Sequence, residues 1–230
     1  MKNKSYIGLS FIILVFGILF VPKIVDRIKN GDVVRNDRMS LSYEIKKDAA
    51  KSSLVIMGKA PDFKLTDQNN KWITNADYKG KVYVLEFFFS TCPSICPVMN
   101  KNMVRLQDTF STNPNFGIAS ISINPENDTP KVLNEHAKKI GVTSQNWHLL
   151  TGDKNYIFNL SNKGFNIFAG ESKEKVNGGF EHSGLFALID KNGAIRCRRD
   201  QHGNPILYYD GLEEAGIKAI TEDIKLLLNE

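Results

Sequence analysis

Apolar and polar positions along the chain alternate in a way that predicts strands followed by helices. Residues 81–90 (KVYVLEFFFS) form a nearly continuous apolar run of β-branched and aromatic side chains, which is typical of a central strand covered on both faces. Residues 97–110 then place apolar side chains at helical spacing, and Pro97 suits the first position of that helix. The pattern therefore predicts a strand, a short loop and a helix, in this order.

The same alternation continues toward the C-terminus. We expect strands at 117–124 and 147–151, a hairpin of strands 185–190 and 194–199, and helical segments at 129–140, 156–163 and 212–228. Asp128 should cap the helix at 129–140, and Gly141 should close it. Helices that alternate with strands, followed by a late antiparallel hairpin, predict a three-layer α/β/α domain built on a mixed central sheet.

The first 25 residues differ in pattern from everything that follows. Residues 6–21 are uncharged and mostly apolar, and they come close to the length of about 17 to 25 residues that spans a bilayer. Neither the small residues of a signal-peptidase site nor a cysteine for lipid attachment follows this run. We predict an uncleaved transmembrane helix at residues 1–25, a polar stalk at 26–57 and a folded domain at 58–230.

Composition narrows the classes of function that this 230-residue chain can have. Thirty Lys and Arg residues against 25 Asp and Glu residues leave a formal charge of +5, but the basic residues are scattered among acidic ones. Because no basic stripe with interleaved aromatic residues is present, we expect no nucleic-acid binding. Three cysteines are too few for a disulfide framework, so thiol reactivity or metal binding is the better interpretation.

Cys92 and Cys96 stand four residues apart, each followed by proline, where the central strand gives way to a helix. Pro97 disfavours helical geometry at Cys96, so Cys96 should lie at the helix start, where the positive end of the helix dipole favours a thiolate. Such thiols serve either disulfide exchange or binding of a soft metal, and their spacing does not separate the two.

Histidine can complete a metal site. His182 lies in a glycine-flanked segment, residues 178–184 (GGFEHSG), that enters the strand predicted at 185–190 and could reach the cysteine loop. The other three histidines, His136, His148 and His202, are interpreted as structural or surface residues. Two thiolates and one imidazole suit three-coordinate copper(I), and can hold copper(II) with a further ligand, whereas structural zinc usually takes four ligands. Copper is therefore the expected metal.

Several segments together resemble the Sco/SenC family. They are residues 60–68 (APDFKLTDQ), 78–82 (YKGKV), 87–97 (FFFSTCPSICP), 124–130 (NPENDTP), 149–152 (LLTG), 182–183 (HS) and 188–193 (LIDKNG). The resemblance covers residues 58–228, and the joint order of the motifs is far more specific than any one of them. The chain departs from the family's usual pattern at Asn124, Asn127 and Glu181, none of which is a proposed ligand.

The resemblance implies a thioredoxin-like fold, a single membrane anchor, and a copper site made of Cys92, Cys96 and His182. It implies a copper carrier rather than an enzyme, one that delivers copper to the copper-site subunit of cytochrome c oxidase during assembly, or keeps its thiols reduced. It also places the domain on the extracytoplasmic, periplasmic side of the membrane. The basic residues that follow the apolar run would by themselves favour the opposite orientation.

Two other functions fit parts of the sequence. In a thiol-disulfide oxidoreductase of the thioredoxin superfamily, Cys92 would attack and Cys96 would resolve, but such proteins generally have two residues rather than three between the cysteines. A thiol peroxidase shares the opening at residues 60–63, but the chain lacks the proline and threonine that precede a peroxidatic cysteine. Cys197 has no assigned role, although a free extracytoplasmic thiol could form mixed disulfides.

Overall fold

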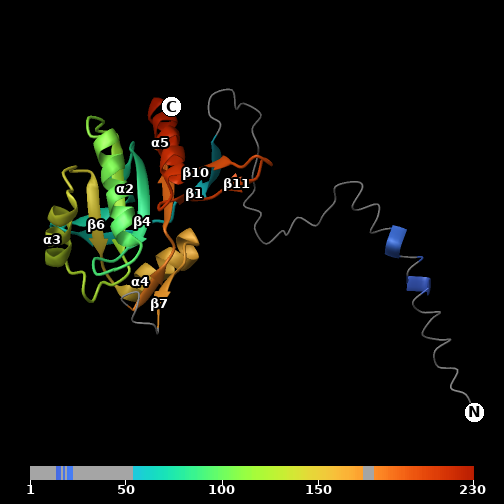
Figure 1. Ribbon diagram of the computed structural model, residues 1–230, viewed down its shortest axis with the longest axis horizontal. Helices are drawn as coiled ribbons and strands as arrows, with labels where there is room; N and C mark the ends of the chain where they lie inside the picture. Colours follow the sequence, from blue (N-terminus) through green and yellow to red (C-terminus); the bar gives the residue numbers. More distant parts are fainter. Residues whose placement is uncertain (1–13, 17, 19, 23–53, 173–178) are drawn as a thin grey trace, which may run out of the picture. The chain divides into compact units, whose positions relative to one another are not determined.

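The computed structural model describes residues 14–16, 18, 20–22, 54–172 and 179–230 (Figure 1). The chain divides into two units, Met1–Lys46 and Lys47–Glu230, and the second contains the folded domain. Within the described residues, no helix combines the length and the apolar character needed to cross a membrane. Most of the predicted anchor and stalk lies outside the described residues, so both stay predictions.

One mixed sheet forms the centre of the domain. Its strands follow the order β1-β10-β9-β4-β5-β6-β2-β3, in which β4, β5 and β6 run parallel and the other neighbours run antiparallel. These strands are β1 (Val55–Lys59), β2 (Lys64–Asp67), β3 (Trp72–Thr74), β4 (Val82–Phe88), β5 (Phe116–Ser122), β6 (Trp147–Thr151), β9 (Leu185–Ile189) and β10 (Ala194–Arg199). The short strands β11 (Pro205–Ile206) and β12 (Tyr209–Asp210) pair with β10 and β9, while β7 (Ala169–Glu171) and β8 (Phe180–His182) form a separate sheet.

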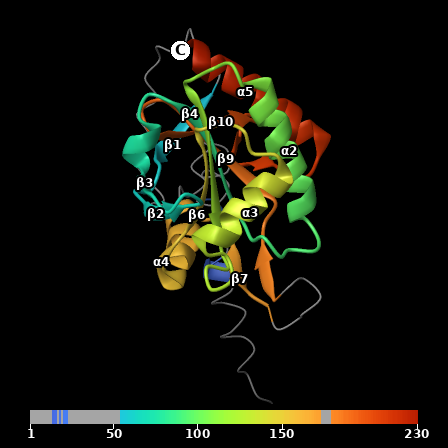
Figure 2. The ribbon, with the colours of Figure 1, turned by 90° about the vertical axis from the view of Figure 1, so that its left-hand side faces the viewer.

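Helices cover both faces of the sheet. Figure 2 shows α2 (Cys96–Thr109), α3 (Pro130–Ile140) and α5 (Glu214–Asn229) on one side, and α4 (Lys154–Asn159) on the other. A 3-10 turn, η2 (Asn75–Tyr78), and a π-helical segment, η3 (Leu160–Phe165), add to this coverage. The predicted three-layer α/β/α arrangement on a mixed sheet is thus the one observed.

β4 is buried along its whole length because other elements pack on both of its faces. The Phe88 ring stacks on His136 of α3, with ring centroids 5.8 Å apart. The neighbouring Phe87 points to the opposite face, where it contacts Phe165 of η3 at 6.0 Å. This burial confirms the predicted central strand, and it places the cysteine loop that follows β4 at the end of a fully buried strand.

The C-terminal end of α3 agrees with the sequence prediction, but its N-cap does not. Gly141 closes the helix in the left-handed region, with φ of 89°, as predicted. The N-cap, however, is Thr129, whose hydroxyl accepts a hydrogen bond from the Val132 amide at 3.4 Å. The prediction that Asp128 caps this helix is wrong, because the Asp128 carboxylate is engaged by the cysteine loop and by β5.

The sequence pattern did not indicate the shortest strands. β7 and β8 have three residues each, and β11 and β12 have two, which is too short for an alternating pattern to develop. β1 also begins at Val55, ahead of the domain start expected at residue 58, and its first pair joins buried Val55 to Cys197 of β10.

Candidate metal centre

Two thiols and one imidazole meet at one end of the central sheet. The Sγ atoms of Cys92 and Cys96 and a ring nitrogen of His182 all lie within 4.8 Å of one another. The cysteines come from the loop after β4 and the first residue of α2, whereas His182 ends β8. Among the described residues, no other set of three cysteine, histidine or acidic side chains is grouped as a possible metal site. The structure thus brings all three predicted site residues together.

Asp128 fixes the beginning of the cysteine loop. Its buried carboxylate accepts a hydrogen bond from the Ser90 amide at 2.9 Å, and further hydrogen bonds from the hydroxyls of Ser90 and Ser122. The amide side chain of Asn127 donates to the same carboxylate at 2.7 Å. Because Ser122 ends β5, this network fastens the loop two residues before Cys92 to the neighbouring parallel strand.

His182 is held by a small hairpin and by aromatic contacts. β8 pairs with β7, and the ring of Phe89 meets the imidazole edge-on, with centroids 5.8 Å apart. His182 Nδ1 lies 3.2 Å from the Ser183 carbonyl oxygen, which can only accept, so Nδ1 carries the proton. The lone pair of Nε2 is then free to face Cys96 Sγ, 3.1 Å away.

Lys154 fastens the β7–β8 hairpin to the loop after β5. Its ammonium group forms ion pairs with Glu171 of β7 and, at 3.3 Å, with Glu126 in the loop after β5. The same group lies 5.8 Å from the centre of the Phe180 ring on β8. Lys154 therefore links the hairpin that carries His182 to the loop after β5.

The two thiols are electrostatically unequal. The hydrogen bond that Cys96 donates lowers the pKa of the Cys92 thiol against the opposing effect of burial, and the Cys96 amide, 3.5 Å away, lowers it further. The same hydrogen bond and burial raise the pKa of Cys96. α2 does begin at Cys96 as expected, but the pKa of Cys96 is raised rather than lowered, and the amide at the helix start hydrogen-bonds to Cys92 Sγ, so it favours a thiolate there instead.

Two hollows flank Cys92. On the His182 side, a hollow of about 430 Å³ is lined by aromatic side chains, among them Phe89, Phe168 and Phe180. On the other side, a hollow of about 490 Å³ between α2 and α3 also contains Cys96. The cysteines can therefore be approached from two directions.

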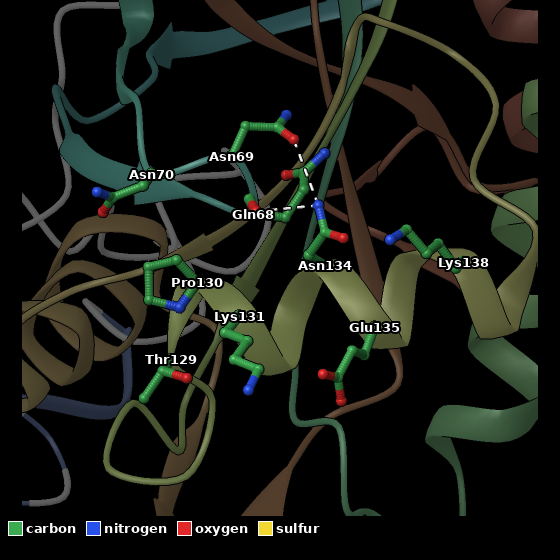
Figure 3. A pocket seen from close by; sticks show the side chains of 9 residues that line it. All are labelled: Gln68, Asn69, Asn70, Thr129, Pro130, Lys131, Asn134, Glu135 and Lys138. Carbon is green, nitrogen blue, oxygen red and sulfur yellow. Dashed lines mark hydrogen bonds between the residues drawn. The ribbon is translucent and has the colours of Figure 1, made fainter.

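A third hollow, of about 680 Å³, lies away from the cysteines beside the turn between β2 and β3 (Figure 3). The side-chain amide of Asn134 on α3 fastens this turn by donating to the Gln68 carbonyl at 3.3 Å and to Asn69 Oδ1 at 3.4 Å. Polar and charged side chains line it, without any cysteine or histidine, so it offers no soft metal ligand.

The remaining histidines and Cys197 do not join the cluster. His136 packs on Phe88, His148 pairs with Asp67 at 3.2 Å, and His202 lies in an exposed turn. Cys197 is a strand residue of β10, as expected, and has no exposed surface. Burial raises the pKa of its thiol to about 11, so this thiol is unreactive in the folded domain.

One buried acidic residue near the site, Glu86, was not among the residues predicted from the sequence. Glu86 lies in the middle of β4, fully buried, and its Oε1 accepts a hydrogen bond from Ser120 Oγ at 2.7 Å. Oε2 has no hydrogen-bond partner among the described residues. Burial raises the pKa of this carboxyl group to about 7, although the Ser120 hydrogen bond opposes the rise. A single glutamate inside an apolar run was the signal that could have identified it.

Comparisons with known proteins show similar sequences and similar folds. Residues 57–215 match the SCO1/SenC family. A SCO1/SenC family lipoprotein from Bacillus anthracis is 29% identical, with a TM-score of 0.64 over 74% of this chain and 95% of that one. BsSco from Bacillus subtilis, a member of the Sco family of cytochrome c oxidase assembly proteins in which a disulfide switch was identified, is 28% identical, with a TM-score of 0.59 over 73% of this chain and 92% of that one.

A more distant structure is similar in fold. ScoI from Bradyrhizobium japonicum, whose structure contains copper, is 22% identical, with a TM-score of 0.57 over 74% of this chain and 99% of that one. The mixed sheet, the helices on both faces and the cysteine loop at the start of α2 define a thioredoxin-like protein. The chain belongs to the SCO1/SenC family, which confirms the resemblance seen in its sequence.

Proposed function

We propose that this protein binds copper through Cys92, Cys96 and His182 and passes it to the copper site of a cytochrome c oxidase subunit while that enzyme is assembled. The convergence of the three side chains within 4.8 Å carries the proposal. Two sulfur donors and one nitrogen donor suit copper(I) in three-coordinate form, and copper(II) with a further ligand. The copper in B. japonicum ScoI and the assembly role of the Sco family support this choice of metal and recipient.

The site is suited to release of its metal as well as to binding. Cys92 lines hollows on both sides of the loop, so thiolates of a recipient can replace the three ligands one at a time. His182 is neutral when Nδ1 alone is protonated, and a neutral nitrogen ligand exchanges more readily for an incoming thiolate than a bound thiolate does.

A second candidate function uses the same cysteines. The lowered pKa of Cys92 makes it the nucleophile that would attack a disulfide of a partner protein, and Cys96 would then resolve the mixed disulfide. In this role the protein would keep the thiols of the oxidase copper site reduced.

We further propose that residues 1–25 anchor the protein in a membrane, that residues 26–57 form a stalk, and that the domain lies on the extracytoplasmic side. The apolar run at residues 6–21 supports the anchor. The B. anthracis relative is a lipoprotein, which supports a membrane-attached domain of this kind.

A titration with copper(I) under anaerobic conditions, against a competing chelator, tests the proposal. We would use the reduced full chain in a nonionic detergent, and compare it with His182→Ala and with the control His202→Ala, whose histidine lies in an exposed turn away from the cysteines. We expect one tightly bound equivalent, a loss of affinity of about tenfold or more in His182→Ala, and no change in His202→Ala. Disulfide formation should persist in both variants.

Two other outcomes of this titration would change the conclusion. If copper(I) binds only weakly while Cys92 and Cys96 cycle readily between dithiol and disulfide, the oxidoreductase function is the better conclusion. If copper(I) binds tightly but with equal affinity in His182→Ala, the carrier function stands and the assignment of His182 as a ligand is wrong.

A further inference from the structure

A second surface feature adjoins the metal centre on the side away from His182. α2 and α3 enclose a groove that has Cys92 and Cys96 at one end, and we call it the basic groove. It is lined by Pro97, Lys101, Val104, His136, Lys139 and Ile140, among others, and has a volume of about 490 Å³. The half-buried side chains of Val104 and Ile140 provide apolar surface between the two helices.

The charges along this groove have one sign. Besides the two cysteines, every titratable side chain that lines it is basic. Arg105 is already neutralised by Glu214, to which it donates two hydrogen bonds of 2.8 and 2.7 Å. Lys101 and Lys139 are exposed and form no ion pair with the described residues. Two lysines without an ion pair among the described residues therefore line the same groove as Val104, Ile140 and the two thiols.

We infer that the basic groove docks an acidic polypeptide segment of the protein that exchanges copper or thiols with Cys92 and Cys96. The identity of this partner as the recipient of copper rests on the function proposed above. A complementary charge on the recipient would accelerate its encounter and hold its own thiols at the end of the groove.

The chemistry of the groove favours a polypeptide over other anions. A recipient must bring thiolates or imidazoles to Cys92 and Cys96, and neither a free phosphate nor a lipid headgroup carries such ligands. Val104 and Ile140 add apolar surface to the groove that the two lysines line, which fits a segment with both apolar side chains and carboxylates. A surface that served only solubility would have no need to concentrate unpaired lysines beside the one reactive thiol pair.

Peptide binding tests this inference without any copper. We would measure fluorescence anisotropy of a labelled, glutamate-rich peptide titrated with the reduced, metal-free full chain in nonionic detergent. Serine replaces cysteine in the peptide, so that docking is separated from thiol chemistry. We expect saturable binding that weakens as salt concentration rises, and a loss of affinity of about tenfold in Lys101→Glu/Lys139→Glu. A lysine-rich peptide should show the reverse preference and bind the variant better than the natural chain.

A matched control uses two other lysines of α3. Lys131→Glu/Lys138→Glu makes the same change in net charge, but both residues line the separate hollow of Figure 3. We expect this variant to bind the acidic peptide within about twofold of the natural chain, because neither residue lines the basic groove. Circular dichroism would verify that each variant is folded.

Three results would overturn the inference. They are equal binding of acidic and neutral peptides, an equal loss of affinity in the control variant, or competition in which millimolar phosphate or anionic vesicles displace the peptide while binding the groove themselves. Each of these concerns docking alone. A failure to bind copper(I) would instead contradict the proposed function and leave the peptide measurement intact.

Discussion

Glu86 is an ionisable group inside the core, and its environment links the stability of the domain to pH. Burial raises the pKa of its carboxyl group from 4.5 to about 7. The folded state therefore binds a proton that the unfolded state has released between pH 4.5 and 7, so the contribution of Glu86 to stability falls as pH rises through this window. Below pH 4.5 both states are protonated, and the group has no effect.

We expect Glu86→Gln to remove this pH dependence. Its free energy of unfolding relative to that of the natural chain should rise between pH 4 and pH 8, by up to about 3 kcal/mol. Denaturant unfolding of the reduced protein across this pH range measures the difference. Ser120→Ala removes the hydrogen bond that favours the carboxylate, so it should make the pH dependence steeper. A difference between Glu86→Gln and the natural chain that is constant with pH would contradict this account.

The difference between the pKa values of Cys92 and Cys96 predicts which thiol reacts first. Because the pKa of Cys92 is lowered and that of Cys96 is raised, a thiol reagent at mildly acidic pH should modify Cys92 first. Mass spectrometry of the metal-free, reduced chain after brief alkylation identifies the site. In Cys96→Ala, which removes the hydrogen-bond donor, alkylation of Cys92 should require a higher pH. Earlier modification of Cys96 would show that the helix start, rather than Cys92, holds the thiolate.

At the scale of elements, the connection between the cysteine loop and β5 depends on one carboxylate. Asp128→Ala leaves the amide and hydroxyl of Ser90 and the hydroxyl of Ser122 without their acceptor. We expect a loss of about 3 kcal/mol in stability and a weaker affinity for copper(I). Denaturant unfolding and chelator competition measure the two effects.

The adjacent residue supplies the control for Asp128. Thr129→Ala removes the cap of α3, at a cost of about 1 kcal/mol, but leaves the hydrogen bonds to Ser90 intact. It should therefore lower stability without changing copper(I) affinity. If both variants lost affinity in proportion to stability, Asp128 would act only on folding and not on the position of the loop.

Elements with a long, regular pattern could be predicted from the sequence, and short ones could not. β4 and α2 were predictable because a continuous apolar run and a helical repeat each extend over many residues. β7 and β8 were not, because three residues with mixed exposure set no period. His182 could still be identified as a candidate from its flanking glycines, but the strand that carries it and its contact with Phe89 arise from tertiary packing.

The use of Asp128 shows a similar limit at a single position. Asp and Thr are both good N-cap residues, and they stand side by side at positions 128 and 129. The sequence alone does not indicate that the first of them turns toward Ser90, because that choice depends on where β4 and β5 end relative to each other. The parallel pair Phe88 to Ser122 is what brings these ends together.

At the scale of the whole molecule, the proposed anchor predicts where the protein is found in the cell. Deletion of residues 1–25 should move the protein from the membrane fraction to the soluble fraction, without changing the number of copper ions bound per chain. Fractionation after alkaline extraction distinguishes an integral protein from one that is adsorbed. If the full chain were extracted by alkali, the anchor proposal would be wrong. Protease added outside spheroplasts should cleave the domain if it lies on the extracytoplasmic side.

Cys197 can serve as a probe of local unfolding in the domain. Because the Cys197 thiol on β10 is fully buried, a reagent can reach it only when β10 separates from its neighbours. With Cys92 and Cys96 blocked first, the rate at which Cys197 is labelled therefore reports how often the folded domain opens locally. Comparing this rate with and without copper(I) would show whether metal binding changes how often the strands around Cys197 open.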